Sequence, residues 1–245
     1  IVLVTGPTGS GKSTTLYSAL KELNNDTVNI CTVEDPVEFN MMNVNQFQVN
    51  EKIGFSFSGA LRSLLRQDPD IIMLGEIRDE ETGRIATQAA LTGHLVLSTL
   101  HTNDAPSAVT RLINIGVEPF LVSASLEAVL AQRLVRKICT SCKEPYEPPV
   151  NVRRAVENLA GPVDTFYHGR GCANCRESGY RGRIGIYELL VPDENMRDSI
   201  SKEMSVGELK KLACQAGMTD LREDGVEKVR TGITTLEEVL RVTAG

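Results

Sequence analysis

A glycine-rich motif near the amino terminus constrains the fold of this chain more than any other feature. Residues 6–13 read G-P-T-G-S-G-K-S and match the pattern G-x-x-x-x-G-K-[ST]. An apolar run at residues 1–5 precedes the motif, and Lys12–Leu23 follows with apolar residues at helical spacing. Between a strand and a helix, such glycines let backbone N–H groups point inward at a helix N-terminus, which favours an anion. The motif therefore predicts a loop that binds phosphate groups.

The motif also assigns roles inside the loop. Lys12 is expected to contact the β- and γ-phosphates as a point charge, and the Ser13 hydroxyl is expected to bind Mg²⁺. We therefore predict a site for a nucleoside triphosphate and Mg²⁺. The residues predicted to bind the nucleotide are consecutive: Gly6, Pro7, Thr8, Gly9, Ser10, Gly11, Lys12, Ser13 and Thr14.

Strands and helices are expected to alternate through the first half of the chain. The expected elements are strands at 28–33, 71–74 and 95–100 and helices at 57–66, 80–91, 105–115 and 120–136. This alternation predicts an α/β fold, in which helices cover both faces of a parallel sheet. Residues 37–50, rich in β-branched and aromatic side chains with asparagine breakers, predict a small antiparallel excursion.

The composition changes after the alternating part. Residues 137–187 are rich in Pro, Gly and Arg, and helical periodicity returns from about residue 188. Two capping boxes are expected ahead of amphipathic stretches, at Ser205-x-x-Glu208 and Thr235-x-x-Glu238. The expected domains are a nucleotide-binding core at 1–136, a small cysteine-bearing module at 137–187 and a helical subdomain at 188–245.

Acidic side chains should meet the phosphate loop at one edge of the sheet. In open α/β sheets, ligands bind beyond the carboxyl ends of the strands. Glu34 and Asp35 follow the second predicted strand, and Glu76 follows the third. A nucleotide hydrolase needs carboxylates there to orient water and hold Mg²⁺. The alternative is that these residues are turn formers or helix caps; beside the phosphate loop, we predict that Glu34 and Glu76 are catalytic.

Three basic side chains are weaker candidates for the same site. His101 follows the fourth predicted strand, on the phosphate side of the sheet, and could contact the γ-phosphate. Arg62 and Arg66 lie four residues apart and hence on one face of a predicted helix. These arginines either form a surface salt-bridge row or stabilise a phosphoryl group, within the chain or across a subunit interface.

Two C-x-x-C pairs predict a metal site. Cys139 and Cys142 form one pair, and Cys172 and Cys175 form the other after a spacer of 29 residues. Four thiolates can bind one zinc ion tetrahedrally, which leaves no open position for water and indicates a structural site. The alternative, a redox dithiol, needs only one such pair at the start of a helix.

Charge and hydropathy limit the partners of the chain. The net charge is −6, and an acidic protein is a poor partner for nucleic acid because binding phosphates needs a basic surface. Only residues 133–183, with 10 Lys and Arg against 5 Asp and Glu, offer a basic patch. No apolar run approaches the ~18 residues of a membrane span. The start at Ile1, without a signal-peptide layout, predicts a piece of a longer cytosolic protein.

Several sequence blocks resemble one known family in content and in order. The blocks are GPTGSGKSTTLY at 6–17, TVEDPVEF at 32–39, LRSLLRQDPDIIMLGEIRDEET at 61–82, TGHLVLSTLHTNDA at 92–105, RKICTSCKEPY at 136–146 and GCANCRESGYRGRIGIYELL at 171–190. With them the chain resembles the type II secretion and type IV pilus assembly ATPases, the GspE/PilB group of secretion motors.

The resemblance implies roles for individual residues. Glu34 would lie in the family's Asp box and polarise the attacking water. Glu76 would be the glutamate of a variant Walker B motif, in which glycine replaces the aspartate that usually binds Mg²⁺. His94 and His101 match the family's His box. Arg62 and Arg66 match arginines near the nucleotide, and the four cysteines match a zinc-binding insertion.

The resemblance also implies an activity and partners. The chain would be the RecA-like part of a homo-hexamer that hydrolyses ATP with Mg²⁺ and contains Zn²⁺. Its closure would move an inner-membrane platform protein, with a membrane-anchored cytoplasmic partner, so the protein would be cytoplasmic and peripheral at the bacterial inner membrane. The family's upstream domains are missing from this sequence, which predicts weak basal turnover.

Three alternatives stay open at this point. A pilus retraction motor would share the core, although such motors generally lack the four cysteines. A nucleic-acid translocase would use the basic stretch 133–183, and an inactive scaffold would bind nucleotide without hydrolysing it. The resemblance does not separate type II secretion from type IV pilus assembly.

Overall fold

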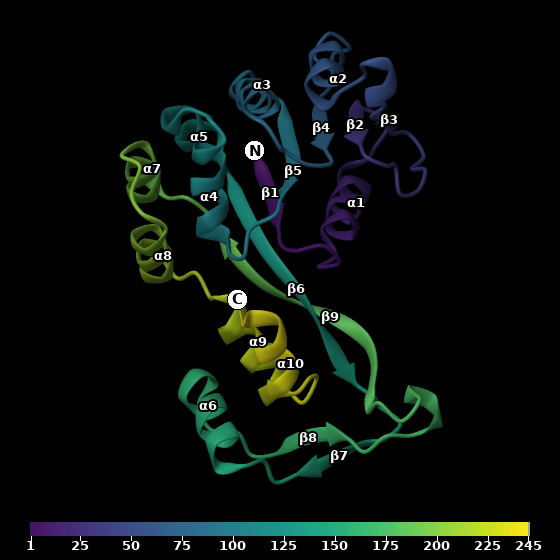
Figure 1. Ribbon diagram of the computed structural model, residues 1–245, viewed down its shortest axis with the longest axis vertical. Helices are drawn as coiled ribbons and strands as arrows, with labels where there is room; N and C mark the ends of the chain where they lie inside the picture. The colour runs from purple at the N-terminus through teal and green to yellow at the C-terminus, as the bar shows by residue number, and fades with distance from the viewer. Residues whose placement is uncertain (245) are drawn as a thin grey trace. The chain divides into compact units, whose positions relative to one another are not determined.

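A computed structural model describes residues 1–244, which form two compact units (Figure 1). The first unit joins Ile1–Ala131 to Leu189–Met218, and the second joins Gln132–Glu188 to the chain from Thr219 onward. Each unit is thus built from two separate stretches of chain. The three consecutive domains expected from the sequence stay a prediction about how the chain is divided.

A seven-stranded sheet contains the predicted strands, and its order is β3-β2-β4-β5-β1-β6-β9. The strands are β1 (Val2–Thr5), β2 (Ile30–Glu34), β3 (Asn45–Gln48), β4 (Ile71–Leu74), β5 (Leu95–Leu100), β6 (Ala128–Ile138) and β9 (Tyr180–Leu190). Every neighbouring pair from β3 to β6 is parallel. The α/β fold class is therefore confirmed, and the parallel order brings the carboxyl ends of β1, β2, β4 and β5 to one edge.

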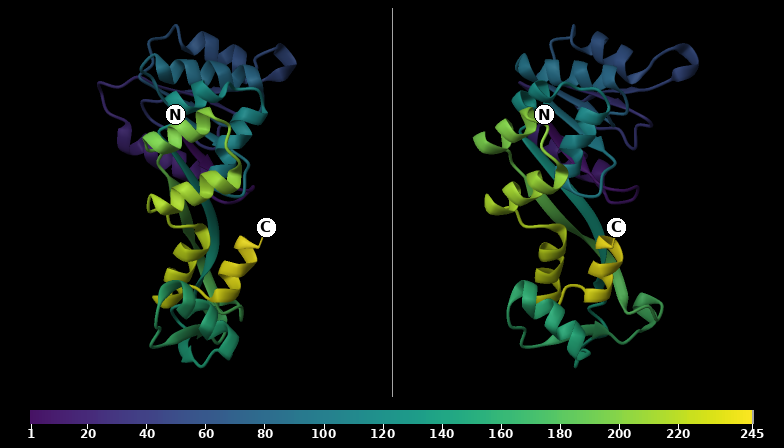
Figure 2. Two further views of the ribbon diagram at one scale, coloured as in Figure 1. Left: turned by 90° about the vertical axis from the view of Figure 1, so that its left-hand side faces the viewer. Right: turned by 60° about the vertical axis from the view of Figure 1, so that its left-hand side comes forward.

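The helices of the first unit follow the predicted pattern closely up to α4. They are α1 (Lys12–Leu23), α2 (Phe57–Leu64), α3 (Glu80–Leu91), α4 (Ala105–Asn114), α5 (Pro119–Ser125), α7 (Glu194–Ser201) and α8 (Val206–Gln215). Leu16, Tyr17 and Leu20 of α1 share one face and pack on the sheet in a buried apolar cluster. Helices α7 and α8 come late in the sequence but pack against α5 and α4 (Figure 2).

The helix predicted over 120–136 was wrong in its second half. Helix α5 ends at Ser125, and Ala128–Ile138 is strand β6. Residues Ala128–Ala131 pair in parallel with Val2–Thr5 of β1. The Leu, Ala, Gln and Arg residues here favour helix intrinsically, but pairing with a distant strand outweighs that small preference.

The antiparallel excursion predicted for residues 37–50 was wrong in direction. Strand β3 pairs in parallel with β2, and Cys31 lies opposite Asn45. The chain between Glu34 and Asn45 therefore returns to the beginning of β2 before pairing starts. An antiparallel contact occurs only at the end of the predicted segment, as a single bridge between Asn50 and Phe55.

The second unit contains a two-stranded antiparallel sheet. Its elements are β7 (Lys143–Tyr146), α6 (Val150–Ala160), β8 (Phe166–Gly169), the 3₁₀ turn η2 (Ala173–Cys175), α9 (Leu221–Arg230) and α10 (Leu236–Thr243). Helix α9 packs against α6, α10 and β8.

One of the two predicted capping boxes is confirmed. The Ser205 hydroxyl accepts from the backbone N–H of Glu208 at 3.4 Å, and the Glu208 carboxylate accepts from the Ser205 backbone N–H at 3.0 Å. The box predicted at Thr235 and Glu238 was wrong. The Glu238 carboxylate is buried between two guanidinium groups, and the Thr235 hydroxyl bonds with the Tyr180 hydroxyl at 2.8 Å. A buried carboxylate gains more from paired cations than from a helix cap.

Within residues 1–244, every helix is too short or too polar to cross a bilayer.

Candidate nucleotide and metal sites

The glycine-rich loop joins β1 to α1, as the motif predicts. Gly9 and Gly11 have φ angles of 79° and 93°, a left-handed conformation that glycine adopts without steric cost. Gly11 is the N-cap of α1, so the loop ends where the helix begins. The positive end of the helix therefore faces the place expected for phosphate groups.

The start of the loop is tied to the segment that carries His101. The Thr5 hydroxyl donates to the Leu100 carbonyl at 3.0 Å, and the Thr102 backbone N–H donates to the Thr5 hydroxyl at 2.9 Å. These bonds hold the ends of β1 and β5 together. Lys12 extends over the loop, where its ammonium donates to the Gly6 carbonyl at 2.9 Å. The Ser13 side chain is exposed at the start of α1, open to a metal ion.

Glu34 ends β2 beneath helix α1 and is 4% exposed. Its Oε1 accepts from the Thr32 hydroxyl at 2.6 Å and from the Gln46 amide at 3.0 Å. Its Oε2 accepts from the Tyr17 hydroxyl. The carboxylate therefore lies among three donors from α1, β2 and β3, and its water-activating role stays a prediction.

Glu76 lies in a cluster of charges just beyond β4. Its carboxylate pairs with Arg78, and its Oε2 lies 3.6 Å from His101 Nε2. Arg78 also lies 3.8 Å from an Asp35 oxygen, so the cluster joins residues that follow β2, β4 and β5. Burial first, and then the Lys12 charge, lowers the pKa of His101 below its usual 6.5. His101 is therefore neutral at pH 7 and can accept or donate a hydrogen bond.

Arg62 and His94 have partners elsewhere in the first unit. Arg62 pairs with Glu81 of α3, and both side chains are about half exposed. His94 Nδ1 lies 2.9 Å from the Ala89 carbonyl, at the end of β5 away from the phosphate loop. Arg66 is exposed just after α2. The catalytic roles of Arg62 and Arg66 stay predictions.

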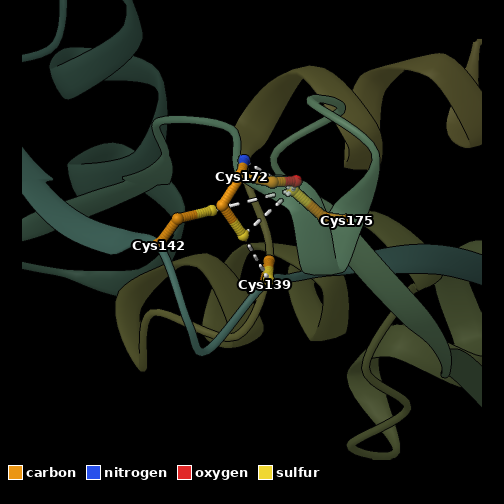
Figure 3. A group of neighbouring side chains, drawn as sticks. All are labelled: Cys139, Cys142, Cys172 and Cys175. Atoms are coloured by element: carbon orange, nitrogen blue, oxygen red, sulfur yellow. Dashed lines mark hydrogen bonds between the residues drawn. The ribbon is translucent and has the colours of Figure 1, made fainter.

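The four predicted cysteines converge in the second unit (Figure 3). Their sulfur atoms all lie within 4.8 Å of one another. Three pairs are 3.7–3.9 Å apart: Cys172 with Cys175, Cys142 with Cys175, and Cys139 with Cys172. Metal–sulfur bonds of about 2.3 Å in a tetrahedron place sulfurs about 3.8 Å apart. The cluster therefore fits a tetrahedral four-thiolate metal ion.

Backbone groups around the cysteines also suit a metal. Cys175 Sγ accepts from the backbone N–H of Cys172 at 3.2 Å and of Gly179 at 3.3 Å. Burial favours the neutral thiol, but these bonds, together with those from the Cys172 and Cys142 thiols, outweigh it and lower the pKa of Cys175 from 9.0 to about 7. At Cys142 burial prevails and raises the pKa of the thiol to about 12. In metal sites, hydrogen bonds to the ligand sulfurs hold the thiolates in place.

Sequence reasoning missed four side chains around the nucleotide site. Tyr17, Thr32 and Gln46 surround Glu34, and Arg78 pairs with Glu76. The sequence could have indicated Thr32, because it lies two positions before Glu34 and residues at this spacing share one face of a strand. Tyr17 and Gln46 carry no sequence signal for this contact, because their distance from Glu34 along the chain is not set by a local repeat.

These features define an α/β nucleotide-binding protein of the P-loop class with an added four-cysteine cluster that fits a metal ion. The family model "Type II/IV secretion system protein" matches residues 1–241. The chain belongs to this family.

Named relatives are about 55% identical to this chain over the part of each that aligns. It is 55% identical to "Type IV pilus assembly ATPase PilB" of Myxococcus xanthus, over 100% of this chain and 44% of that protein. It is also 55% identical to "Type II secretion system protein E" of Pseudomonas aeruginosa, over 99% of this chain and 48% of that protein. The chain thus spans about half the length of these relatives.

Solved structures share the fold over the whole chain. The pilus retraction motor PilT with bound ADP matches with a TM-score of 0.74 and 32% identity, over 100% of this chain and 61% of that one. The Legionella pneumophila ATPase DotB matches with a TM-score of 0.71 and 27% identity, over 100% and 60%.

Proposed function

We propose that this chain is the motor part of a type II secretion or type IV pilus assembly ATPase, and that it converts ATP and water to ADP and phosphate. The observation that carries the proposal is the meeting of the phosphate loop, Glu76 and His101 at one edge of the sheet. The named relatives, which are secretion and pilus assembly ATPases, support it.

Each residue has a distinct task in this mechanism. The loop from Gly6 to Thr14 binds the phosphates, and Lys12 leaves its loop carbonyls to contact them. Ser13 would hold Mg²⁺, which would supply neutralisation of phosphate charge. Glu34 accepts a proton from water, whose oxygen bonds to the γ-phosphorus as the bond to the bridging oxygen of ADP breaks. His101 and Glu76 hold the γ-phosphate side of the site.

The assembly and location follow from the same proposal. The motor acts as a homo-hexamer, in which Arg62 and Arg66 face the nucleotide of a neighbouring subunit. It pushes an inner-membrane platform protein and is held by a membrane-anchored cytoplasmic partner, so it is cytoplasmic and peripheral at the bacterial inner membrane. The four cysteines would hold Zn²⁺ as a structural ion, and their sulfur spacing supports this assignment.

Retraction is the second candidate, because the retraction motor PilT has the same fold over the full chain. Identity separates the two: 32% to that motor, against 55% to proteins named for assembly and secretion. The four clustered cysteines also support assembly or secretion.

The first experiment measures ATP turnover of the purified chain against concentration, with mass by light scattering. Turnover that rises as a hexamer forms and does not respond to single-stranded DNA is expected. Lys12→Ala should reduce it at least 100-fold, because the phosphates lose their main cation. Lys21→Ala, at the far end of α1, is the control. Stimulation by DNA that weakens steeply with salt would favour a translocase instead.

A second experiment tests whether Glu34 is the general base. Glu34→Gln should abolish turnover and leave ATP binding intact, since proton transfer follows docking. Glu38→Gln, a nearby exposed carboxylate, should change neither. Full turnover in Glu34→Gln would remove Glu34 from the mechanism, and loss of ATP binding would make it a structural residue.

A further inference from the structure

The two oxygens of the Glu34 carboxylate differ in the number of hydrogen bonds that they accept. Each carboxylate oxygen offers about two acceptor sites. Oε1 uses both, for the Thr32 hydroxyl at 2.6 Å and the Gln46 amide at 3.0 Å. Oε2 accepts only one side-chain donor in the described chain, the Tyr17 hydroxyl. One acceptor site on Oε2 is therefore left for a water molecule.

Tyr17 is itself held on several sides. Its hydroxyl accepts from the Glu38 backbone N–H at 3.1 Å, which directs its own proton towards Glu34. Its ring is 4% exposed and meets the Phe39 ring edge-on, with centroids 4.4 Å apart. Burial first, and then the bond to Glu34, raises the pKa of Tyr17 to about 12. The hydroxyl therefore remains a donor throughout the physiological pH range.

Tyr17 also connects the two halves of the nucleotide site. It lies on α1, the helix that begins with Lys12 and Ser13, and it packs with Leu16 and Leu20 against the sheet. A helix fixed against the sheet by apolar contacts is a rigid support for a hydrogen-bond donor. The element that binds phosphate therefore also fixes one oxygen of the predicted base.

We propose that Tyr17 is a positioning residue for ATP hydrolysis: its hydroxyl orients Glu34 so that Oε2, and not Oε1, takes the proton of the attacking water. This inference rests on the proposed function of Glu34. The proton passes from water to Oε2 while the water oxygen bonds to the γ-phosphorus and ADP leaves. Tyr17 keeps its own proton throughout and does not touch the substrate.

Tyr17→Phe tests the proposal because it removes one hydroxyl and keeps the ring. The kcat for ATP should fall about tenfold, since a misplaced reacting group slows the step without preventing it. The KM for ATP should stay within twofold of the unaltered chain, because phosphate binding does not use this hydroxyl. Ser18→Ala is the matched control: it removes a hydroxyl from the next residue of α1, where the bond goes to the Thr14 carbonyl at 2.8 Å. It should leave kcat and KM unchanged.

A double variant separates positioning from general damage. In the Glu34→Gln background, adding Tyr17→Phe should cause no further loss of the residual rate, because Tyr17 acts through the carboxylate. An equal fall in both backgrounds would show that Tyr17 acts independently of Glu34 and would overturn the proposal. An unchanged kcat in Tyr17→Phe, when Glu34→Gln loses turnover, would also overturn it.

The experiments distinguish a failure of the proposed function from a failure of the role proposed for Tyr17. Full turnover in Glu34→Gln would reject Glu34 as the base, and with it the role of Tyr17. If Tyr17→Phe does not fold, Phe39→Ala decides, because it loosens the Tyr17 ring from an exposed position. A lower kcat at constant KM would support the proposal, and an unchanged kcat would overturn it.

Discussion

The two compact units are stabilised by different kinds of contact. In the first unit, apolar side chains of α1 pack on a parallel sheet whose central strands are fully buried. In the second unit, cations lie over aromatic rings, with Lys143 4.1 Å from the Tyr167 centroid and Arg136 4.3 Å from that of Tyr180.

The second unit also concentrates its ionic and thiol contacts. Glu238 is buried between Arg136 and Arg241, and the four-cysteine cluster joins β6, η2 and their flanking turns. Stability from apolar burial depends weakly on pH and on metal. Ion-pair contacts depend on pH, and contacts between thiolates and a metal ion depend on both pH and metal. The comparison therefore predicts that the two units respond to different perturbations.

The largest effect is expected from losing one metal ligand. Cys172→Ser, or removal of zinc by a chelator, should unfold the second unit, because zinc contributes on the order of 10 kcal/mol in small zinc domains. Four of the five tyrosines lie in this unit, and the chain has no tryptophan. Tyrosine fluorescence during thermal unfolding therefore reports on this unit. Cys214→Ser, in the first unit, should leave the profile unchanged. An unchanged profile in Cys172→Ser would contradict the prediction.

A core truncation should act on the first unit instead. Leu20 is fully buried between α1 and the sheet, and Leu20→Ala should cost about 2–5 kcal/mol of unfolding free energy. Urea unfolding followed by far-ultraviolet circular dichroism measures the loss. Leu23→Ala, on the same helix but 36% exposed, should cost much less. Equal losses in the two variants would break the comparison.

A pH-dependent effect is expected in the second unit. Burial raises the pKa of Glu238, but hydrogen bonds from Arg241 and Arg136 outweigh it and lower that pKa from 4.5 to about 2. A carboxyl group with a lowered pKa stabilises the folded state above its unfolded pKa, and this stability is lost as pH falls towards the folded value. Glu238→Gln should therefore cost on the order of 2 kcal/mol at pH 7.

The sign of that effect is testable. The stability difference between Glu238→Gln and the unaltered chain should be constant above pH 5 and shrink between about pH 4.5 and pH 2. Urea midpoints followed by tyrosine fluorescence at each pH measure it. Glu237→Gln, the exposed neighbour, is the control. A difference that grows on acidification would have the wrong sign.

The smallest effect is expected at a helix cap. Ser205 caps α8 through a reciprocal pair of bonds with Glu208, and Ser205→Ala should cost about 1 kcal/mol. Ser201→Ala, at an exposed position near the end of α7, should cost a few tenths of this or less. Chemical unfolding of both variants measures the difference. No loss in Ser205→Ala would mean that solvent replaces the cap.

The predictable part of the site depended on local pattern. The phosphate loop was recognisable because its residues are consecutive. The strand ending at Leu74 was marked by a continuous apolar run, and the strand ending at Glu34 by mostly apolar and β-branched residues. The cysteine pairs were recognisable because each pair is three residues apart, and the structure brings all four sulfurs together.

The unpredictable part depended on partners distant in sequence. The partners of Glu34 include Gln46 on the edge strand β3, whose direction was predicted wrongly from the sequence. The stretch Ala128–Ile138 has residues that favour helix, and pairing with β1 and β9 makes it a strand. Glu238 has the spacing of a capping residue, but ion pairs with Arg241 and with Arg136, 102 positions earlier, make it a buried carboxylate.

The sequence by itself thus determined the class of the protein: a phosphate loop, an alternating α/β core and two cysteine pairs suited to a metal ion, all indicated by short-range spacing. Tertiary structure decided which side chains surround the reacting groups and which segments join into one unit. The physical reason is range, because periodicity and motifs act over a few residues. Pairing, burial and charge partnership depend on chain segments that meet only when the protein folds.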